Sequence, residues 1–336
     1  MKKVVVGLGI LILAVGLVAS GYVVHAMATR TKFGAADQTS ADNINVMLTR
    51  ADDWVRLVNS PVITKDEMVI LDGSTATIPI TAELFRQFFN YSDGQVRSEP
   101  VVHHSMTDRA YRLLIEGDSS REWNYDTSLI FVTPPSADEL AYAQQSGVEL
   151  DLAPIARDGF VFITHKNNPI DSLTVAQIQG IYTGEITNWS QVGGDDRTIL
   201  AYQREQNSGS QTAMEEMVMQ GLEMQSPITT KVHIGMGALV NAVAEYDNGP
   251  ASIGYTYFYY INNLYKSDDI KVIRVEDTPP TDDNLISGAY PFATNYLAVM
   301  RADEPLDSPA RILRDYLLTS EGQSVIAMAG YCRVEN

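Results

Sequence analysis

The chain has 336 residues, enough for about two domains of ordinary size, and 45% of them are hydrophobic, as in a folded globular protein. Its formal net charge of −18 disfavours nucleic acid as a partner and excludes a bulk electrostatic attraction for anions. Any anion site must therefore be local. Five histidines and one cysteine show no metal-ligand spacing, so we expect neither a metal ion nor a cofactor.

The N-terminus carries a targeting signal. Lys2 and Lys3 precede an apolar run over residues 4–24, and Ala26-Met27-Ala28 follows it. This pattern is typical of a secretory signal cleaved after Ala28 or of an uncleaved membrane anchor. A run of about 21 apolar residues is sufficient to span a bilayer. We expect residues 1–28 to be one of the two, favour an anchor at the outer face of the cytoplasmic membrane, and place the rest of the chain outside the cytoplasm.

A polar spacer separates this segment from the folded region. Residues 29–65 are mostly polar, and an amphipathic stretch over residues 46–58 indicates one short helix within them. From about residue 66 the chain alternates strand-like and helix-like segments, the pattern of an α/β protein.

The first half of the α/β region contains several strand and helix signals. Residues 68–71 form the first predicted strand, and Pro79 opens a helix after it, because proline is well tolerated in the first helical turn. Residues 101–102 lead through a polar turn into a second helix. Residues 129–132 form another apolar strand.

Three hydroxyl-rich turns each precede a helix, at residues 74–77, 105–107 and 208–210. In an open parallel sheet, ligands bind beyond the carboxyl ends of the strands, where helix N-termini converge. Such turns can surround a tetrahedral oxyanion with hydroxyl groups and backbone N–H donors. Serine and threonine are also the usual helix caps, so a structural role for each single turn stays open.

The third turn follows an arginine. Arg204 stands four residues before Ser208, which has the pattern of a helix N-cap, and Gln211 completes a predicted capping box. Gly209 lets the backbone approach an anion closely, and the planar, always-charged fork of Arg204 suits an oxyanion. The alternative interpretation is an ordinary helix cap beside a surface arginine.

Several strings in the second half of the chain point to one family. A strand over residues 158–165 precedes a capped helix that closes with Thr183-Gly184-Glu-Ile-Thr-Asn-Trp189. With Ala251-Ser-Ile-Gly-Tyr255 and Tyr316-Leu-Leu-Thr-Ser-Glu-Gly-Gln323, this string closely resembles the phosphate-binding proteins of phosphate ABC transporters. The resemblance covers roughly residues 66–334, and its motifs occur in the order and spacing of the family.

The resemblance implies an α/β, two-lobed periplasmic-binding-protein fold of type II, the Venus-flytrap, with the ligand in the cleft. One lobe is expected over residues 66–157 and 289–336, and the other over residues 158–288. The resemblance also implies an extracytoplasmic monomer that closes around inorganic phosphate by a hinge motion and delivers it to the permease subunits of an ABC importer. We expect no enzymatic activity.

The resemblance assigns the ligand-binding residues as well. Arg204 and Ser208-Gly209-Ser210 match the phosphate-binding arginine and the serine–glycine–hydroxyl turn of the family at the same spacing. The other residues come from the first two turns and the loop after a strand: Ser74, Thr75, Thr77, the N–H of Ile78, Ser105, Thr107 and Thr133.

One departure from the family concerns a proton acceptor. Family members often place an aspartate after the fourth strand, where it accepts a proton from bound phosphate. This chain has Phe131-Val-Thr133-Pro-Pro there, and Asp126 lies before the strand. The hydroxyl oxygens of Thr133, Thr107 or Ser136 can accept a hydrogen bond instead. Because a neutral acceptor discriminates less sharply against an unprotonated dianion, we expect phosphate to be preferred over sulfate by a narrower margin.

Other functions stay open or are disfavoured. The ligand could be another tetrahedral oxyanion such as sulfate, or the protein could be a phosphate sensor that feeds no transporter. A phosphoester hydrolase on the same scaffold is disfavoured, because the sequence lacks a metal cluster and an activated nucleophile.

Two further patterns are expected to be structural. Gly235-Met-Gly237 lacks the third glycine of a dinucleotide fingerprint and is predicted to start a helix. The aromatic run over residues 255–260 is predicted to pack in the core and in the wall of the cleft.

Overall fold

The computed structural model describes residues 54–99, 101–117, 127–226, 232–233, 236–244 and 249–334. The chain divides into two compact units, Met1–Asp37 and Gln38–Asn336, and all of these residues belong to the second. The predicted signal or anchor, and the predicted spacer before residue 54, lie outside the described ranges. Within those ranges, no helix combines the length and the apolar character that a membrane crossing needs.

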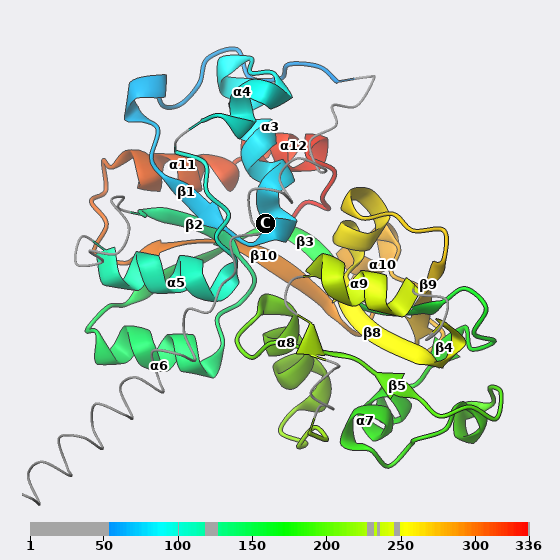
Figure 1. The fold of residues 1–336 in the computed structure, drawn as a ribbon. Coiled ribbons are helices and arrows are strands. Elements are labelled where there is room, and N and C mark those ends of the chain that lie inside the picture. The colour runs from blue at the N-terminus through cyan, green and yellow to red at the C-terminus, as the bar shows by residue number, and fades with distance from the viewer. Residues whose placement is uncertain are drawn as a thin grey trace, which may run out of the picture. The chain divides into compact units, whose positions relative to one another are not determined.

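Strands and helices alternate along the second unit, as predicted (Figure 1). The strands are β1 (Leu71–Gly73), β2 (Leu129–Val132), β3 (Leu150–His165), β4 (Ser172–Leu173), β5 (Leu200–Ala201), β6 (Gln203–Arg204), β7 (Val232–His233), β8 (Ser252–Tyr257), β9 (Ile270–Val275) and β10 (Ala293–Arg301). The helices are α3 (Ile78–Phe89), α4 (Asp93–Arg97), α5 (Thr107–Glu116), α6 (Ala137–Gln145), α7 (Val175–Thr183), α8 (Gly209–Ala213), α9 (Met236–Ala244), α10 (Asp282–Ile286), α11 (Pro309–Leu317) and α12 (Ser320–Met328). Single turns of 3-10 helix include Thr75–Thr77, and a π-helical segment, Met214–Met219, continues α8.

One mixed sheet organises these elements. Its strands lie in the order β1-β2-β10-β3-β8-β5, and β9 pairs with β3 and β4 beside this path. β1 runs parallel to β2 and β5 parallel to β8, whereas β10 is antiparallel to both of its neighbours. The sheet is therefore not the open parallel sheet from which we predicted the position of the hydroxyl-rich turns. The first of those turns still follows a strand of its parallel part.

β3 joins the two halves of the sheet (Figure 1). Its residues 150–159 pair with β10, and its residues 160–164 pair with β8. At this change of partner, the buried Asp158 carboxyl accepts hydrogen bonds from the backbone N–H of Tyr259 and from the Tyr296 hydroxyl, both at 3.0 Å. One side chain thus connects β3, β10 and the segment that follows β8.

The first strand lies later in the chain than predicted. Residues 68–70 have no regular structure, and β1 pairs Gly73 with Phe131 of β2. A Cβ atom at Gly73 would lie 2.1 Å from the Phe131 carbonyl oxygen. Only glycine allows this close approach, so the strand extends to Gly73, two residues beyond the predicted end.

The end of the predicted spacer helix is not helical. Residues 54–58 have no regular structure, and the rest of that predicted helix lies outside the described residues. Gln87 of α3 accepts the Leu57 N–H at 2.6 Å and donates to the Val55 carbonyl at 2.9 Å. Arg56 donates to two carbonyl oxygens near the end of α3, each at 2.9 Å. These bonds occupy backbone groups that a helix would use internally and hold the segment against α3.

The aromatic run over residues 255–260 packs as predicted. Tyr255, Tyr257 and Tyr260 are each 1% exposed and belong to the main hydrophobic cluster. The rings of Phe160 and Tyr255 are 5.5 Å apart between centroids, so β3 and β8 are joined by aromatic packing as well as by backbone hydrogen bonds.

The Asp158 carboxyl predicts how stability depends on pH. Burial raises its pKa to about 7, whereas an aspartate of an unfolded chain has a pKa of about 4. Between these values the folded protein holds a proton that the unfolded chain has lost. The free energy of unfolding therefore falls by up to ~1.4 kcal/mol per pH unit as the pH rises through this window. Asp158→Asn keeps a hydrogen-bond acceptor and removes the titration. Its free energy of unfolding, measured with urea, should therefore increase relative to that of the wild type as the pH rises. A constant difference from about pH 4.5 to about pH 8 would contradict this account.

Candidate functional site

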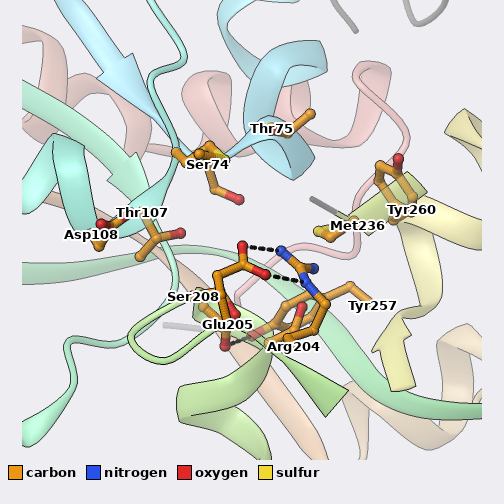
Figure 2. A pocket seen from close by; sticks show the side chains of 13 residues that line it. Ser74, Thr75, Thr107, Asp108, Arg204, Glu205, Ser208, Met236, Tyr257 and Tyr260 are labelled. Carbon is orange, nitrogen blue, oxygen red and sulfur yellow. Dashed lines mark hydrogen bonds and ion pairs between the residues drawn. The ribbon is translucent and has the colours of Figure 1, made fainter. Parts of the chain in front are cut away.

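One small pocket gathers parts of all three hydroxyl-rich turns (Figure 2). Its cavity has a volume of about 40 Å³. It is lined by Ser74, Thr75, Met106, Thr107, Asp108, Arg204, Glu205, Ser208, Gly209, Ser210, Met236, Tyr257 and Tyr260. The predicted site residues that meet here are Ser74, Thr75, Thr107, Arg204, Ser208, Gly209 and Ser210.

The first turn places Ser74 at the pocket. Ser74 caps the 3-10 turn after β1, and its side chain accepts the Ala76 N–H at 3.2 Å. α3 begins directly afterwards with Pro79 in its first turn, as predicted. Figure 2 shows the Ser74 hydroxyl pointing into the pocket. The cap geometry therefore fixes the direction of a group that lines the cavity.

A buried carboxyl fastens the second turn to the first. Asp72 accepts hydrogen bonds from the backbone N–H and from the hydroxyl of Ser105, both at 2.7 Å. His104 places its Nδ1 atom 2.8 Å from the Ser74 carbonyl oxygen. Burial lowers the pKa of His104 to about 4, so its ring is neutral near pH 7. These contacts hold the two turns together. They also occupy the hydroxyl of Ser105, a predicted ligand-binding residue that does not line the pocket.

The third turn is a helix cap, but the predicted capping box is only half formed. The Ser208 side chain accepts the Gln211 N–H at 3.2 Å. The Gln211 side chain does not return to the cap, because its Oε1 atom accepts from the Arg204 N–H at 3.3 Å and from the Tyr255 hydroxyl. The Tyr257 hydroxyl donates to the Gly209 carbonyl at 3.0 Å. The turn is thus attached to β6 and β8, which sequence spacing could not indicate.

Ser210 contributes a buried hydroxyl to the pocket. The residue is 2% exposed, and its Oγ atom has no hydrogen-bond partner among the described residues. Buried polar groups are nearly always hydrogen-bonded, so such a group in a pocket wall is available to a ligand.

Arg204 is the cationic side chain among the lining residues, and it is paired with its neighbour Glu205. Arg204 donates from Nε to Glu205 Oε2 at 3.0 Å and from Nη2 to Glu205 Oε1 at 2.8 Å, as the dashed lines in Figure 2 mark. The Arg204 side chain is only 4% exposed, against 28% for Glu205. A buried guanidinium is therefore held in a two-point ion pair inside the pocket.

Asp108 is a pocket residue that the sequence reasoning missed. It follows Thr107 in the first turn of α5, where an acidic residue usually complements the helix dipole. Met106, just before, has a φ of 80°, which is uncommon for a residue with a side chain. Burial raises the pKa of Asp108 to about 6, and the Glu205 carboxylate adds to the increase. Two acidic residues, Asp108 and Glu205, therefore line the pocket together with Thr107, one of the hydroxyl residues that we expected to replace the family aspartate.

Four predicted site residues lie outside the pocket lining: Thr77, Ile78, Ser105 and Thr133. The Thr77 hydroxyl oxygen lies 2.7 Å from the Phe131 carbonyl oxygen, and the Ile78 N–H donates to the Thr75 carbonyl. Thr133 lies close to the third turn, since a Cβ atom at Gly209 would lie 2.3 Å from its Oγ1 atom. Ser136 lines a separate hollow with Asp138, and Asp126 lies outside the described residues.

The sequence matches a family and several curated relatives. A family model, the PBP superfamily domain, matches residues 61–320. The phosphate-binding protein PstS of Borreliella burgdorferi is 22% identical over 284 residues, which cover 80% of this chain and 91% of the relative. The phosphate-binding protein PstS of Staphylococcus epidermidis is 23% identical over 267 residues, 77% of each chain.

Solved structures show the same fold. A protein of Clostridium perfringens, assigned as a phosphate ABC transporter substrate-binding protein and solved with bound phosphate, aligns with a TM-score of 0.60 and 26% identity over 80% of this chain and 99% of its own. An ABC-type phosphate transport receptor of Vibrio cholerae aligns with a TM-score of 0.57 and 22% identity over 80% and 100%. The predicted α/β, two-lobed fold and the predicted resemblance are thereby confirmed. Because the family model spans most of the sequence, this chain belongs to the PBP superfamily.

Proposed function

We propose that this protein binds inorganic phosphate outside the cytoplasm and delivers it to the permease of an ABC importer. The observation that carries the proposal is the meeting of one guanidinium with several hydroxyls in one small cavity, from Arg204, Ser74, Thr107, Ser208 and Ser210. A planar fork and neutral hydroxyl donors match the oxygens of a tetrahedral anion. The names of the PstS relatives and the phosphate bound in the Clostridium perfringens structure support this choice of ligand.

The lobe boundaries and the attachment to the membrane belong to the same proposal. We assign residues 66–157 and 289–336 to one lobe and residues 158–288 to the other. The change of partner along β3, at residues 159 and 160, lies beside this boundary and supports it. The protein acts as a monomer, with residues 4–24 as its anchor.

The protein carries out no reaction in this proposal. Its relatives are binding proteins, and no histidine that could activate a serine lines the pocket. In the part of the chain that the structure describes, no three His, Cys, Asp or Glu residues are grouped to hold a metal ion. Turnover of a chromogenic phosphate ester by the purified protein would contradict this assignment.

Truncating Arg204 tests the pocket as a phosphate site. Arg204→Ala removes the cation among the lining residues and leaves a bound anion beside Asp108 and Glu205. Hydrogen bonds to charged groups contribute ~1.5–3 kcal/mol each, so phosphate affinity measured by calorimetry should fall at least about tenfold. The exposed Arg197, changed to alanine, is the control and should leave affinity unchanged. Wild-type affinity in Arg204→Ala would remove this residue from the site.

Because Asp108 lines the pocket, we expect phosphate affinity to exceed sulfate affinity by a wider margin than the sequence alone suggested. Near pH 8 its carboxylate can accept the P–OH hydrogen bond and repels an unprotonated dianion. Below about pH 6 it is protonated, and the repulsion of sulfate weakens. Competition calorimetry at about pH 8 should therefore show a clear phosphate preference that narrows at lower pH and in Asp108→Asn.

The matched control for Asp108 is Asp138→Asn. Asp138 is likewise the second residue of a helix, but it lies in the separate hollow rather than in the pocket. This variant should keep the wild-type preference. Tighter binding of sulfate than of phosphate by the wild type at both pH values would refute phosphate as the ligand, while the fold and the pocket would stand.

A further inference from the structure

The Arg204–Glu205 pair occupies the position where the proposed ligand would meet its cation. Both side chains line the cavity, and the carboxylate makes two contacts to the guanidinium, at 2.8 Å and 3.0 Å. In Figure 2 the Glu205 carboxylate points into the space bounded by Ser74, Thr107 and Arg204. A carboxylate on a guanidinium presents two oxygens to two N–H groups, as an oxyanion does.

A ligand and Glu205 cannot share Arg204 without cost. The cavity volume is about 40 Å³, so an anion that enters comes close to the carboxylate already there. Asp108, a further acidic residue, also lines the cavity. Two anions against one guanidinium that is 4% exposed repel each other strongly, because burial reduces screening by water. Glu205 is the partner that can move, since its side chain is 28% exposed.

We propose that Glu205 is an internal competitor for the anion: its carboxylate compensates Arg204 in the empty pocket, and the bound oxyanion displaces it. This inference rests on phosphate binding as proposed above and adds a residue that sets its affinity. The pair has a physical reason, because a buried guanidinium without a counter-charge would destabilise the empty protein. The measured affinity then reports an exchange of one ion pair for another, which lowers it below the intrinsic affinity of the pocket.

Two substitutions of Glu205 separate displacement from other roles. Glu205→Gln removes the charge and weakens the competing contact. Glu205→Asp keeps the charge but shortens the side chain by one methylene, so that it no longer spans the two-point contact. If Glu205 competes, calorimetry with inorganic phosphate at about pH 8 should show binding about tenfold tighter in Glu205→Gln and tighter by a smaller factor in Glu205→Asp.

The control and a second measurement address charge and folding. Glu216→Gln removes one exposed negative charge outside the pocket and should bind phosphate as the wild type does. Thermal unfolding should show a lower midpoint for ligand-free Glu205→Gln than for the wild type, and a larger rise on addition of phosphate. A residue with a purely structural role would lower the midpoint without enlarging that rise.

Each remaining outcome of the binding measurements has one interpretation. Weaker or unchanged binding in Glu205→Gln overturns the inference and shows that Glu205 orients Arg204 in the bound state or does not contribute. Tighter binding in Glu205→Gln with wild-type binding in Glu205→Asp also overturns it, because simple charge repulsion then accounts for the effect. Phosphate binding by the variant but not by the wild type supports it. Failure of the wild type and of both variants to bind phosphate rejects the proposed function and the inference together.

Discussion

The site depends on compensation of the positive charge of one buried guanidinium. The chain carries a net charge of −18, so long-range electrostatics repel the proposed ligand, and attraction must come from within the pocket. In the proposed site Arg204 supplies this attraction, yet its side chain is only 4% exposed, and such a buried guanidinium requires a counter-charge when no ligand is present. Glu205 provides that counter-charge from the adjacent position in the chain. A sequence neighbour thus takes part in the electrostatics of the proposed binding residue, and in the displacement that we propose the empty and bound states differ in which anion faces the arginine.

Buried carboxyls hold the scaffold around this pair. Asp72 accepts two hydrogen bonds from Ser105, which lies 33 positions further along the chain, and thereby joins the loops that carry the first two turns. Asp158 makes a comparable junction where β3 changes partner. Burial raises the pKa of both groups, and the hydrogen bonds that they accept oppose the increase. Each carboxyl therefore connects distant segments at some cost in stability, and that cost grows as the pH rises.

Local signals predicted the helix starts well. Ser208 and Pro79 mark helix N-termini as expected, because capping and proline preferences act within one turn. Contacts with a partner distant in sequence were not foreseen. Ser105 was predicted to bind ligand, but Asp72 engages its hydroxyl. Gly73 lies beyond the predicted first strand of residues 68–71, but the approach of Phe131 places it in β1. The spacing of residues within either segment gives no information about those contacts.

Asp108 shows why a missing motif residue does not establish missing chemistry. The family position for an acceptor lies after a strand and is occupied here by hydroxyl and proline residues, while an acidic residue lines the pocket from the first turn of α5. With Asp108, Glu205 and Arg204 on its walls, the pocket has no surplus of positive charge. Neutral donors must then supply much of the binding free energy, and the hydroxyls of Ser74 and Ser210 are suited to that role. Such a pocket selects an anion by hydrogen-bond geometry and by the proton that the anion carries, because its charge alone would not favour one dianion over another.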